Sequence, residues 1–106
     1  LKLATEGDKR RAIARASLEQ LWMSRAAVNF IIAADYRRIT PKYRQRGIQY
    51  AHFEAGHVAE NILLEAVSLD LGAGIVGAFN DDAVAKEVGM AGGEAPLLIL
   101  PVGHAQ

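Results

Sequence analysis

The sequence predicts a small α/β or α+β fold in which helices lie over one sheet and a long helix takes the central place. Three observations predict it. Residues 51–72 repeat apolar side chains at three- and four-residue steps, which is typical of a helix. Residues 26–34 and 95–102 are short, continuous apolar runs, which are typical of buried strands. The 106 residues, 51% of them hydrophobic, suffice for one core, so we expect a single domain over residues 1–106.

The first elements expected are a helix and a strand. Asp8 is a suitable N-cap for an amphipathic, basic helix over residues 9–25. Residues 26–34 (AAVNFIIAA) follow as a buried strand that Asp35 closes. Asn29 is the one polar side chain in this run and fits a buried strand poorly.

Residues 35–50 mix five Lys or Arg with three Tyr. Cations beside aromatic rings suit single-stranded nucleic acid, because phosphates attract cations and bases stack on flat rings. Pro41 and Gly47 instead favour a solvated connection or a short helix, and no RNA-binding signature accompanies the segment. We therefore interpret it as a connection, with nucleic-acid or anion binding as the weaker alternative.

The long helix expected over residues 51–72 carries apolar side chains on more than one face, which predicts that protein covers it on several sides. Gly72 stands where a helix ending in a left-handed turn needs a residue without a Cβ. Residues 73–79 (AGIVGAF) then predict a short strand whose glycines permit close backbone approach of a ligand or of a neighbouring segment. The apolar positions of the helix are Phe53, Val58, Ala59, Ile62, Leu63, Ala66, Val67, Leu69 and Leu71.

The last elements expected are a short helix and a central strand. Asn80 is a suitable N-cap for a helix over residues 81–88, and Gly89 ends it. Residues 95–102 (APLLILPV) then form a central or near-central strand. Pro101 is expected to mark the end of its pairing, because proline has no N–H to donate.

Charge is zero in total but unevenly distributed. Residues 1–50 hold eleven Lys or Arg against four Asp or Glu, about +7, and residues 51–106 hold one against eight, about −7. Either the halves complement each other, within the fold or across a dimer, or the basic half faces an anion such as a phosphate. The absence of cysteine is compatible with the cytoplasmic location we expect, and no apolar run is long enough to cross a membrane.

Common catalytic and metal-binding patterns fit this sequence poorly. His52 and His57 are five residues apart and so lie on different faces of a helix, which gives no zinc pair of the i, i+4 kind, and we expect no metal site. The absence of cysteine excludes a thiol nucleophile. Residues 72–77 (GAGIVG) match GxGxxG formally, but they follow a helix and enter a strand, the reverse of a dinucleotide-binding turn. Catalytic residues therefore stay unassigned.

Five short motifs occur in a set order and resemble the C-terminal half of the nitroreductase family of flavoproteins. The likeness is greatest to the branch that contains the thiazole/oxazole-forming dehydrogenases. It implies a nitroreductase-like, FMN-dependent α+β fold, with a mixed sheet and helices packed around a long central helix, in a truncated or minimal version. A first residue other than methionine also suggests a partial chain. The motifs are residues 54–57 (EAGH), 61–66 (NILLEA), 69–72 (LDLG), 75–79 (IVGAF), and 96–97 (PL) with 100–103 (LPVG).

The resemblance implies an FMN-dependent oxidoreductase that passes hydride through flavin N5, with NADH or NADPH as a reductant and a homodimer as the assembly. Matched position by position, Ile75, Val76, Gly77 and Ala78 run along the edge of the flavin, and Gln20 lies near its pyrimidine edge. The family holds the FMN phosphate with an N-terminal Arg-Ser segment and with basic residues after the Pro-Val-Gly strand.

The sequence departs from the family in several places. Neither of those phosphate-binding segments occurs in it, so the phosphate is left without assigned ligands. Asp70 replaces the usual glycine, and Glu60 replaces a glutamine or asparagine. The alternative is therefore a flavin-free structural or binding remnant of the fold.

Overall fold

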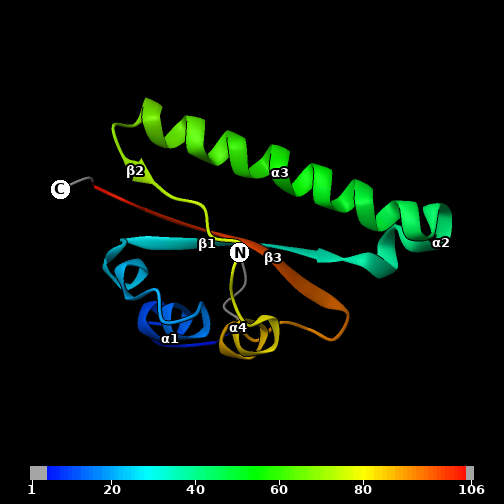
Figure 1. Cartoon of the computed structure of the whole chain (residues 1–106), viewed down its shortest axis with the longest axis horizontal. Coiled ribbons are helices and arrows are strands. Elements are labelled where there is room, and N and C mark those ends of the chain that lie inside the picture. The colour runs from blue at the N-terminus through cyan, green and yellow to red at the C-terminus, as the bar shows by residue number, and fades with distance from the viewer. Residues whose placement is uncertain (1–4, 105–106) are drawn as a thin grey trace.

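The computed structural model of the chain describes residues 5–104 (Figure 1). Its elements in chain order are α1 (Arg10–Ala16), the 3₁₀ helix η1 (Leu21–Arg25), β1 (Val28–Asp35), the 3₁₀ helix η2 (Tyr36–Arg38), α2 (Thr40–Tyr43), α3 (Gln45–Ser68), β2 (Gly72–Ala73), α4 (Asp81–Val88) and β3 (Glu94–Gly103).

A three-stranded sheet of order β1-β3-β2 forms the middle layer. The fold class is confirmed, but both pairings are antiparallel where a mixed sheet was expected. The reason is the strand order. β1 and β2 run in the same direction, but each pairs with β3, which lies between them and runs in the opposite direction. The helices also do not surround the long helix. Instead, α3 covers one face of the sheet, and α1 and α4 cover the other (Figure 1).

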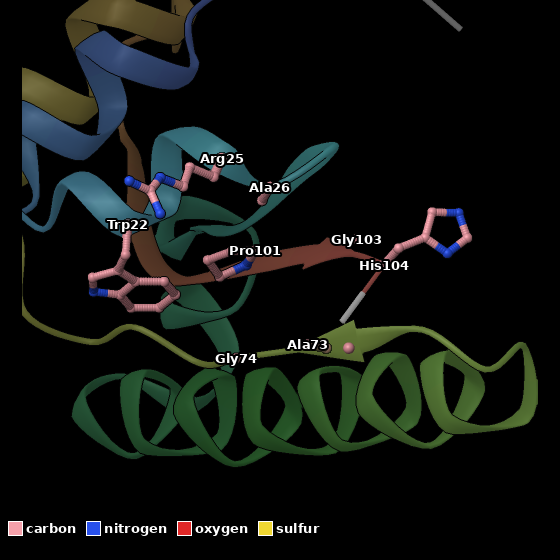
Figure 2. Close-up of a pocket in the computed structure, with 9 residues that line it drawn as sticks. Trp22, Arg25, Ala26, Ala73, Gly74, Pro101, Gly103 and His104 are labelled. Atoms are coloured by element: carbon pink, nitrogen blue, oxygen red, sulfur yellow. The ribbon is translucent and has the colours of Figure 1, made fainter. Parts of the chain in front are cut away.

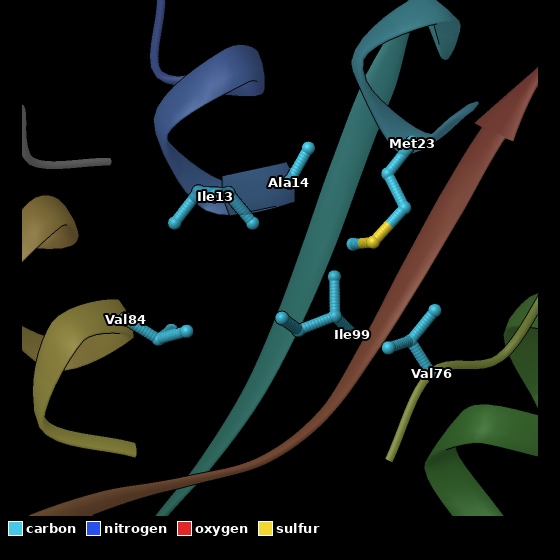
Figure 3. Packing of buried hydrophobic residues seen from close by; sticks show 6 residues of the cluster. All are labelled: Ile13, Ala14, Met23, Val76, Val84 and Ile99. Carbon is cyan, nitrogen blue, oxygen red and sulfur yellow. The ribbon is translucent and has the colours of Figure 1, made fainter. Parts of the chain in front are cut away.

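The hydrophobic core lies between the sheet and the pair α1 and α4 (Figure 3). Ile13 of α1, Val84 of α4 and Ile99 of β3 meet there, each no more than 2% exposed. Met23 of η1 and Val76 close the cluster from the side of β2. The core therefore fixes η1 and the segment around Val76 against the same strand, which is important for the site described below.

The helix predicted over residues 9–25 is wrong in its second half. It ends at Ala16, and Leu18 and Glu19 take left-handed backbone angles of φ 57° and 58°. The buried Ser17 hydroxyl donates to the Ile13 carbonyl at 2.8 Å, and the Ala16 carbonyl accepts from the Asn80 N–H at 2.7 Å. These bonds give donors to two carbonyl groups in the last turn of α1, and the turn after the helix directs Met23 into the core.

The long helix begins earlier than predicted, at Gln45, and ends at Ser68. It packs on the sheet through small side chains, since Ala55, Ala59 and Ala66 are buried. The expectation of a helix covered on several faces is wrong for residues 5–104. Phe53, Val58, Leu64, Val67 and Leu69 are 48–75% exposed, because over residues 5–104 the sheet covers α3 on one side and leaves these side chains uncovered.

Asp70, not Gly72, takes the left-handed position after α3. Its φ is 59°, and the Asp70 and Leu71 N–H groups donate to the Val67 and Ala66 carbonyls at 3.0 and 2.8 Å. These two bonds are those of a Schellman motif, whose left-handed residue is usually glycine. Gly72 lies two residues later in β2, so the glycine that the family pattern places at residue 70 is the one the geometry requires.

Replacing Asp70 by glycine is expected to stabilise the fold by about 1 kcal/mol, because glycine adopts a positive φ without a Cβ clash. Urea unfolding followed by circular dichroism measures the change. Asp70→Ala is the control, since it removes the same carboxylate and keeps the Cβ. It is expected to stabilise nothing, and equal gains from both variants would mean that charge, not backbone angle, is responsible.

The later elements follow the prediction closely, with two corrections. Helix α4 has the predicted bounds, the Asn80 side chain accepts from the Ala83 N–H at 2.9 Å, and Gly89 has φ 67°. The strand predicted over residues 73–79 is only β2 plus a single bridge from Val76 to Ile99. Pro101 does not end the pairing of β3. The Pro101 carbonyl accepts from the Gly74 N–H. Because the N–H and C=O of one strand residue point to the same side, the N–H that proline lacks would face the side of β2 and not β1. Pairing to β1 therefore continues to Val102.

Candidate functional site

The segment predicted to line the flavin runs along the outer side of β3. The Gly74 and Val76 N–H groups point inward and donate to the Pro101 and Ile99 carbonyls at 3.0 and 2.8 Å. The alternate residues Ile75 and Gly77 point their N–H groups outward, as the two-residue period of an extended chain requires. Within residues 5–104, neither of these two groups has a hydrogen-bond acceptor. The segment thus presents two open backbone donors at the edge of the sheet.

The side chains of this segment divide between core and surface. Val76 is 4% exposed and belongs to the core, whereas Ile75 is 52% exposed. A Cβ placed on Gly77 meets only the Leu98 side chain, at the ordinary contact distance of 3.9 Å. Of the four predicted residues, Val76 therefore offers a ligand neither its buried side chain nor its backbone, because its N–H and C=O are both bonded to Ile99, and Ile75, Gly77 and Ala78 form the accessible edge.

The structure brings Gln20 to the same segment. Its side-chain Nε2 donates to the Ala78 carbonyl at 3.1 Å and to the Ser17 carbonyl at 2.7 Å. The predicted residues Gln20 and Ala78, 58 positions apart in the sequence, therefore meet. Because its amide donors are engaged within the chain, Gln20 is placed to position Ala78.

A groove of about 310 Å³ adjoins this segment between η1 and β2 (Figure 2). The Trp22 indole forms one wall and lies 3.4 Å from the position of a Cβ on Gly74. Sequence reasoning missed this groove, because a continuous helix over residues 9–25 would turn η1 differently. The groove is lined by Trp22, Arg25, Ala26, Gly72, Ala73, Gly74, Pro101, Gly103 and His104.

Several of the basic and aromatic residues between 35 and 50 have partners close to them in the fold. Hydrogen bonds from Arg37 lower the pKa of the Asp35 carboxyl to about 2, so that pair stays ionised at neutral pH. The Lys42 ammonium lies 5.1 Å from the centre of the Tyr43 ring. Tyr36 and His52 share a hydrogen bond of 2.8 Å. These contacts favour a structural role for the segment.

Residues 5–104 hold neither a candidate metal site nor a candidate membrane span. No group of three or more His, Asp or Glu side chains is arranged to hold a metal ion within this range. None of the helices over the same residues is long and apolar enough to cross a membrane.

Comparison with known sequences decides the family. The sequence profile of the nitroreductase family matches residues 2–104. The chain belongs to the nitroreductase family. A candidate nitroreductase of Methanocaldococcus jannaschii is 45% identical over 92 residues, which cover 87% of this chain and 46% of that protein. This nitroreductase-family chain therefore spans about half the length of its curated relative.

Solved structures agree with the family assignment. A candidate nitroreductase from Anabaena variabilis superposes with a TM-score of 0.87 and 29% identity, over 94% of this chain and 20% of that one. The NADPH:FMN oxidoreductase of Vibrio harveyi, solved with NAD⁺, superposes with a TM-score of 0.80 over 96% of this chain and 48% of that one. At 24% identity, the second likeness shows the fold alone.

Proposed function

We propose that this nitroreductase-family chain binds FMN and serves as an FMN-dependent oxidoreductase, or as the flavin-edge half of one. The observation that carries the proposal is the pair of open N–H groups at Ile75 and Gly77, on an accessible, glycine-containing edge. An isoalloxazine ring offers acceptors at N5 and O4, so an edge with two outward donors and little side-chain bulk fits it. Family membership supports the same cofactor.

When bound, FMN supplies the redox chemistry, taking up hydride at N5 from a reduced nicotinamide or a substrate and passing it to an acceptor. The chain's own residues orient the ring. Val76 anchors the segment in the core, Gln20 holds the Ala78 carbonyl, and the Ile75 and Gly77 N–H groups donate toward the ring edge. Donors fixed before binding favour the negative charge of the reduced flavin. NADH or NADPH is the reductant we propose, and a cytoplasmic location stays a prediction.

We further propose a homodimer in which α3 of one chain packs on α3 of its partner. Phe53, Leu64 and Val67 are separated by 11 and 3 residues, so they share one flank of the helix, and each is more than half exposed. An uncovered apolar flank of this length marks an interface. Antiparallel pairing also places the basic start of α3, around Arg46, beside the acidic end around Glu65 of the second copy. A second copy of this chain therefore matches the surface in both apolar character and charge.

The direct test adds FMN to the purified protein, removes the excess by gel filtration, and records the visible spectrum beside the intact mass. We expect near-stoichiometric retained flavin that NADH or NADPH bleaches. A protein of the correct mass that retains no flavin and shows no binding in a titration would overturn the proposal. The flavin-free remnant of the fold would then be the better description.

A further inference from the structure

Two titratable side chains from different elements meet beside the first half of α3. The Tyr36 hydroxyl of η2 and the Nε2 atom of His52 on α3 are 2.8 Å apart, and the two rings pack edge to face with their centres 6.0 Å apart. Besides joining η2 to α3, this hydrogen bond engages one of the two ring nitrogens of His52. Within residues 5–104, the other nitrogen, Nδ1, has no hydrogen-bond partner. His52 therefore keeps one nitrogen available to a ligand.

His52 lines a pocket of about 310 Å³ between α3 and β3. The other lining residues are Ala55 and Gly56 of α3 and Leu97 and Leu98 of β3. A Cβ placed on Gly56 would meet no atom within 4 Å, so the helix leaves open space at this position. The pocket thus combines apolar walls with one hydrogen-bonding side chain. This combination suits a small planar ligand that carries a polar atom at its edge.

Two contacts connect the His52–Tyr36 pair with the proposed flavin edge. Leu98 is a wall of the pocket, and its side chain also lies 3.9 Å from the position of a Cβ on Gly77. Burial raises the pKa of the Tyr36 hydroxyl, and the nearby negative charge of Asp81, just after the edge segment in the chain, raises it further. The hydroxyl therefore stays protonated at neutral pH. The pocket and the flavin edge share one wall, and the pair stands beside both.

We propose that His52 is the catalytic acid of the substrate half-reaction, giving a proton from Nδ1 to an acceptor bound in this pocket, and that Tyr36 is a positioning residue. The inference rests on the proposed function and fills a role that the sequence left unassigned. Imidazole is the side chain that most often delivers protons near neutral pH. When the Nε2–H of the imidazolium donates to the Tyr36 oxygen, Nδ1 is the atom left to give up its proton.

The step balances for a planar carbonyl acceptor of the quinone type. One carbonyl oxygen gains hydride from N5 of the reduced flavin, and an electron pair moves through the conjugated ring to the opposite oxygen. That oxygen takes the proton from His52 Nδ1, so quinone, hydride and proton together give a hydroquinone. The neutral imidazole then regains a proton from water. Ferricyanide, in contrast, takes single electrons and no proton, so its reduction needs no acid.

The first test compares these two acceptors on photoreduced, FMN-loaded protein by stopped-flow spectroscopy. His52→Gln is expected to slow reoxidation by 1,4-naphthoquinone about 100-fold, the lower end of the range for a general acid. Reoxidation by ferricyanide should change less than about 2-fold. Tyr36→Phe keeps the acid but loosens it, so the naphthoquinone rate should fall about 3- to 10-fold. His57→Gln is the matched control, because it removes an imidazole from another face of α3, and it should change neither rate.

A second measurement needs neither turnover nor a variant. 1-Naphthol keeps the fused ring and one oxygen but cannot accept hydride. Added to wild-type protein, it should shift the Nδ1 resonance of the His52 ring in ¹H–¹⁵N spectra and leave the resonances of His57 unchanged. This result is expected whether or not His52→Gln folds.

The opposite outcomes separate this proposal from the proposed function. Equal slowing of both acceptors by His52→Gln would show an effect on the flavin site and would overturn the role of acid. An unchanged naphthoquinone rate, or a His52 ring that does not respond to 1-naphthol, would also overturn it, while a protein that retains FMN keeps its proposed function. Wild-type protein that retains no FMN would overturn the proposed function, and the catalytic role of His52 with it.

Discussion

Replacing Gly77 by proline is expected to weaken FMN binding by about 10- to 100-fold, because proline removes the backbone N–H proposed to donate to the flavin. That N–H has no acceptor within residues 5–104, so its loss breaks no hydrogen bond of the described chain. The preceding Val76 is bridged to Ile99 in an extended conformation, which is the conformation that a following proline requires. The effect should therefore fall on the ligand and not on the fold.

Gly77→Ala is the control for this experiment. It keeps the N–H, and its Cβ meets only Leu98 at 3.9 Å, so FMN affinity should stay within about 3-fold of wild type, less than 1 kcal/mol. Titrations of both variants, with unfolding midpoints measured beside them, separate the donor from side-chain bulk. Should the proline variant be unstable, Ile75→Pro tests the second open donor in the same way. Alanine and proline variants with equal affinities would show that Gly77 donates no hydrogen bond to FMN.

The elements that the sequence predicted well are those whose ends are decided by neighbouring residues. Helix α4 has a side-chain cap at Asn80 and a left-handed glycine at Gly89, and both residues are next to the helix in the sequence. Strand β3 is a continuous apolar run, which is how a strand between two others reads. In both cases the local preference and the final packing agree, so the pattern alone is sufficient.

The elements that were mispredicted depend on contacts between distant residues. The break after Ala16 is supported by the Asn80 N–H, 64 residues further along the chain, and by the burial of Met23. No helix propensity encodes either effect. The strand predicted over residues 73–79 has the right composition, but it meets only one neighbour, β3, and pairs with it at intervals.

The candidate site was predicted in part for the same reasons. The family resemblance placed Gln20 and Ala78 at one ligand, and their hydrogen bond shows that they are neighbours. It could not distinguish the buried Val76 from the exposed Ile75, since both are apolar and only the direction of the strand separates them. Trp22 and Arg25 escaped prediction because α1 ends at Ala16 and they belong to a separate 3₁₀ helix, whereas the sequence pattern favoured one continuous α-helix there.

The exposed flank of α3 gives the second large effect. The double substitution Leu64→Asp and Val67→Asp is expected to convert the proposed homodimer to a monomer, raising the dissociation constant at least about 100-fold. A carboxylate buried without a partner costs several kcal/mol, and the two-fold axis places each substitution in the interface twice. Because both side chains are exposed in the single chain, at 59% and 75%, the monomer's own core is not disturbed. Sedimentation equilibrium over a range of concentrations measures the association.

Val58→Asp provides the matched control, since it adds the same negative charge at an apolar α3 position that is 48% exposed and lies about 120° or more around the helix from Leu64 and Val67. It should leave the association unchanged. If the control dissociates the dimer as strongly as the double substitution does, the net charge of the helix controls assembly and the apolar flank does not. If wild-type protein sediments as a monomer at every concentration, the α3 pairing is wrong. The apolar flank would then have to be covered by something other than a second copy of this chain, because an exposed surface of this kind is costly in water.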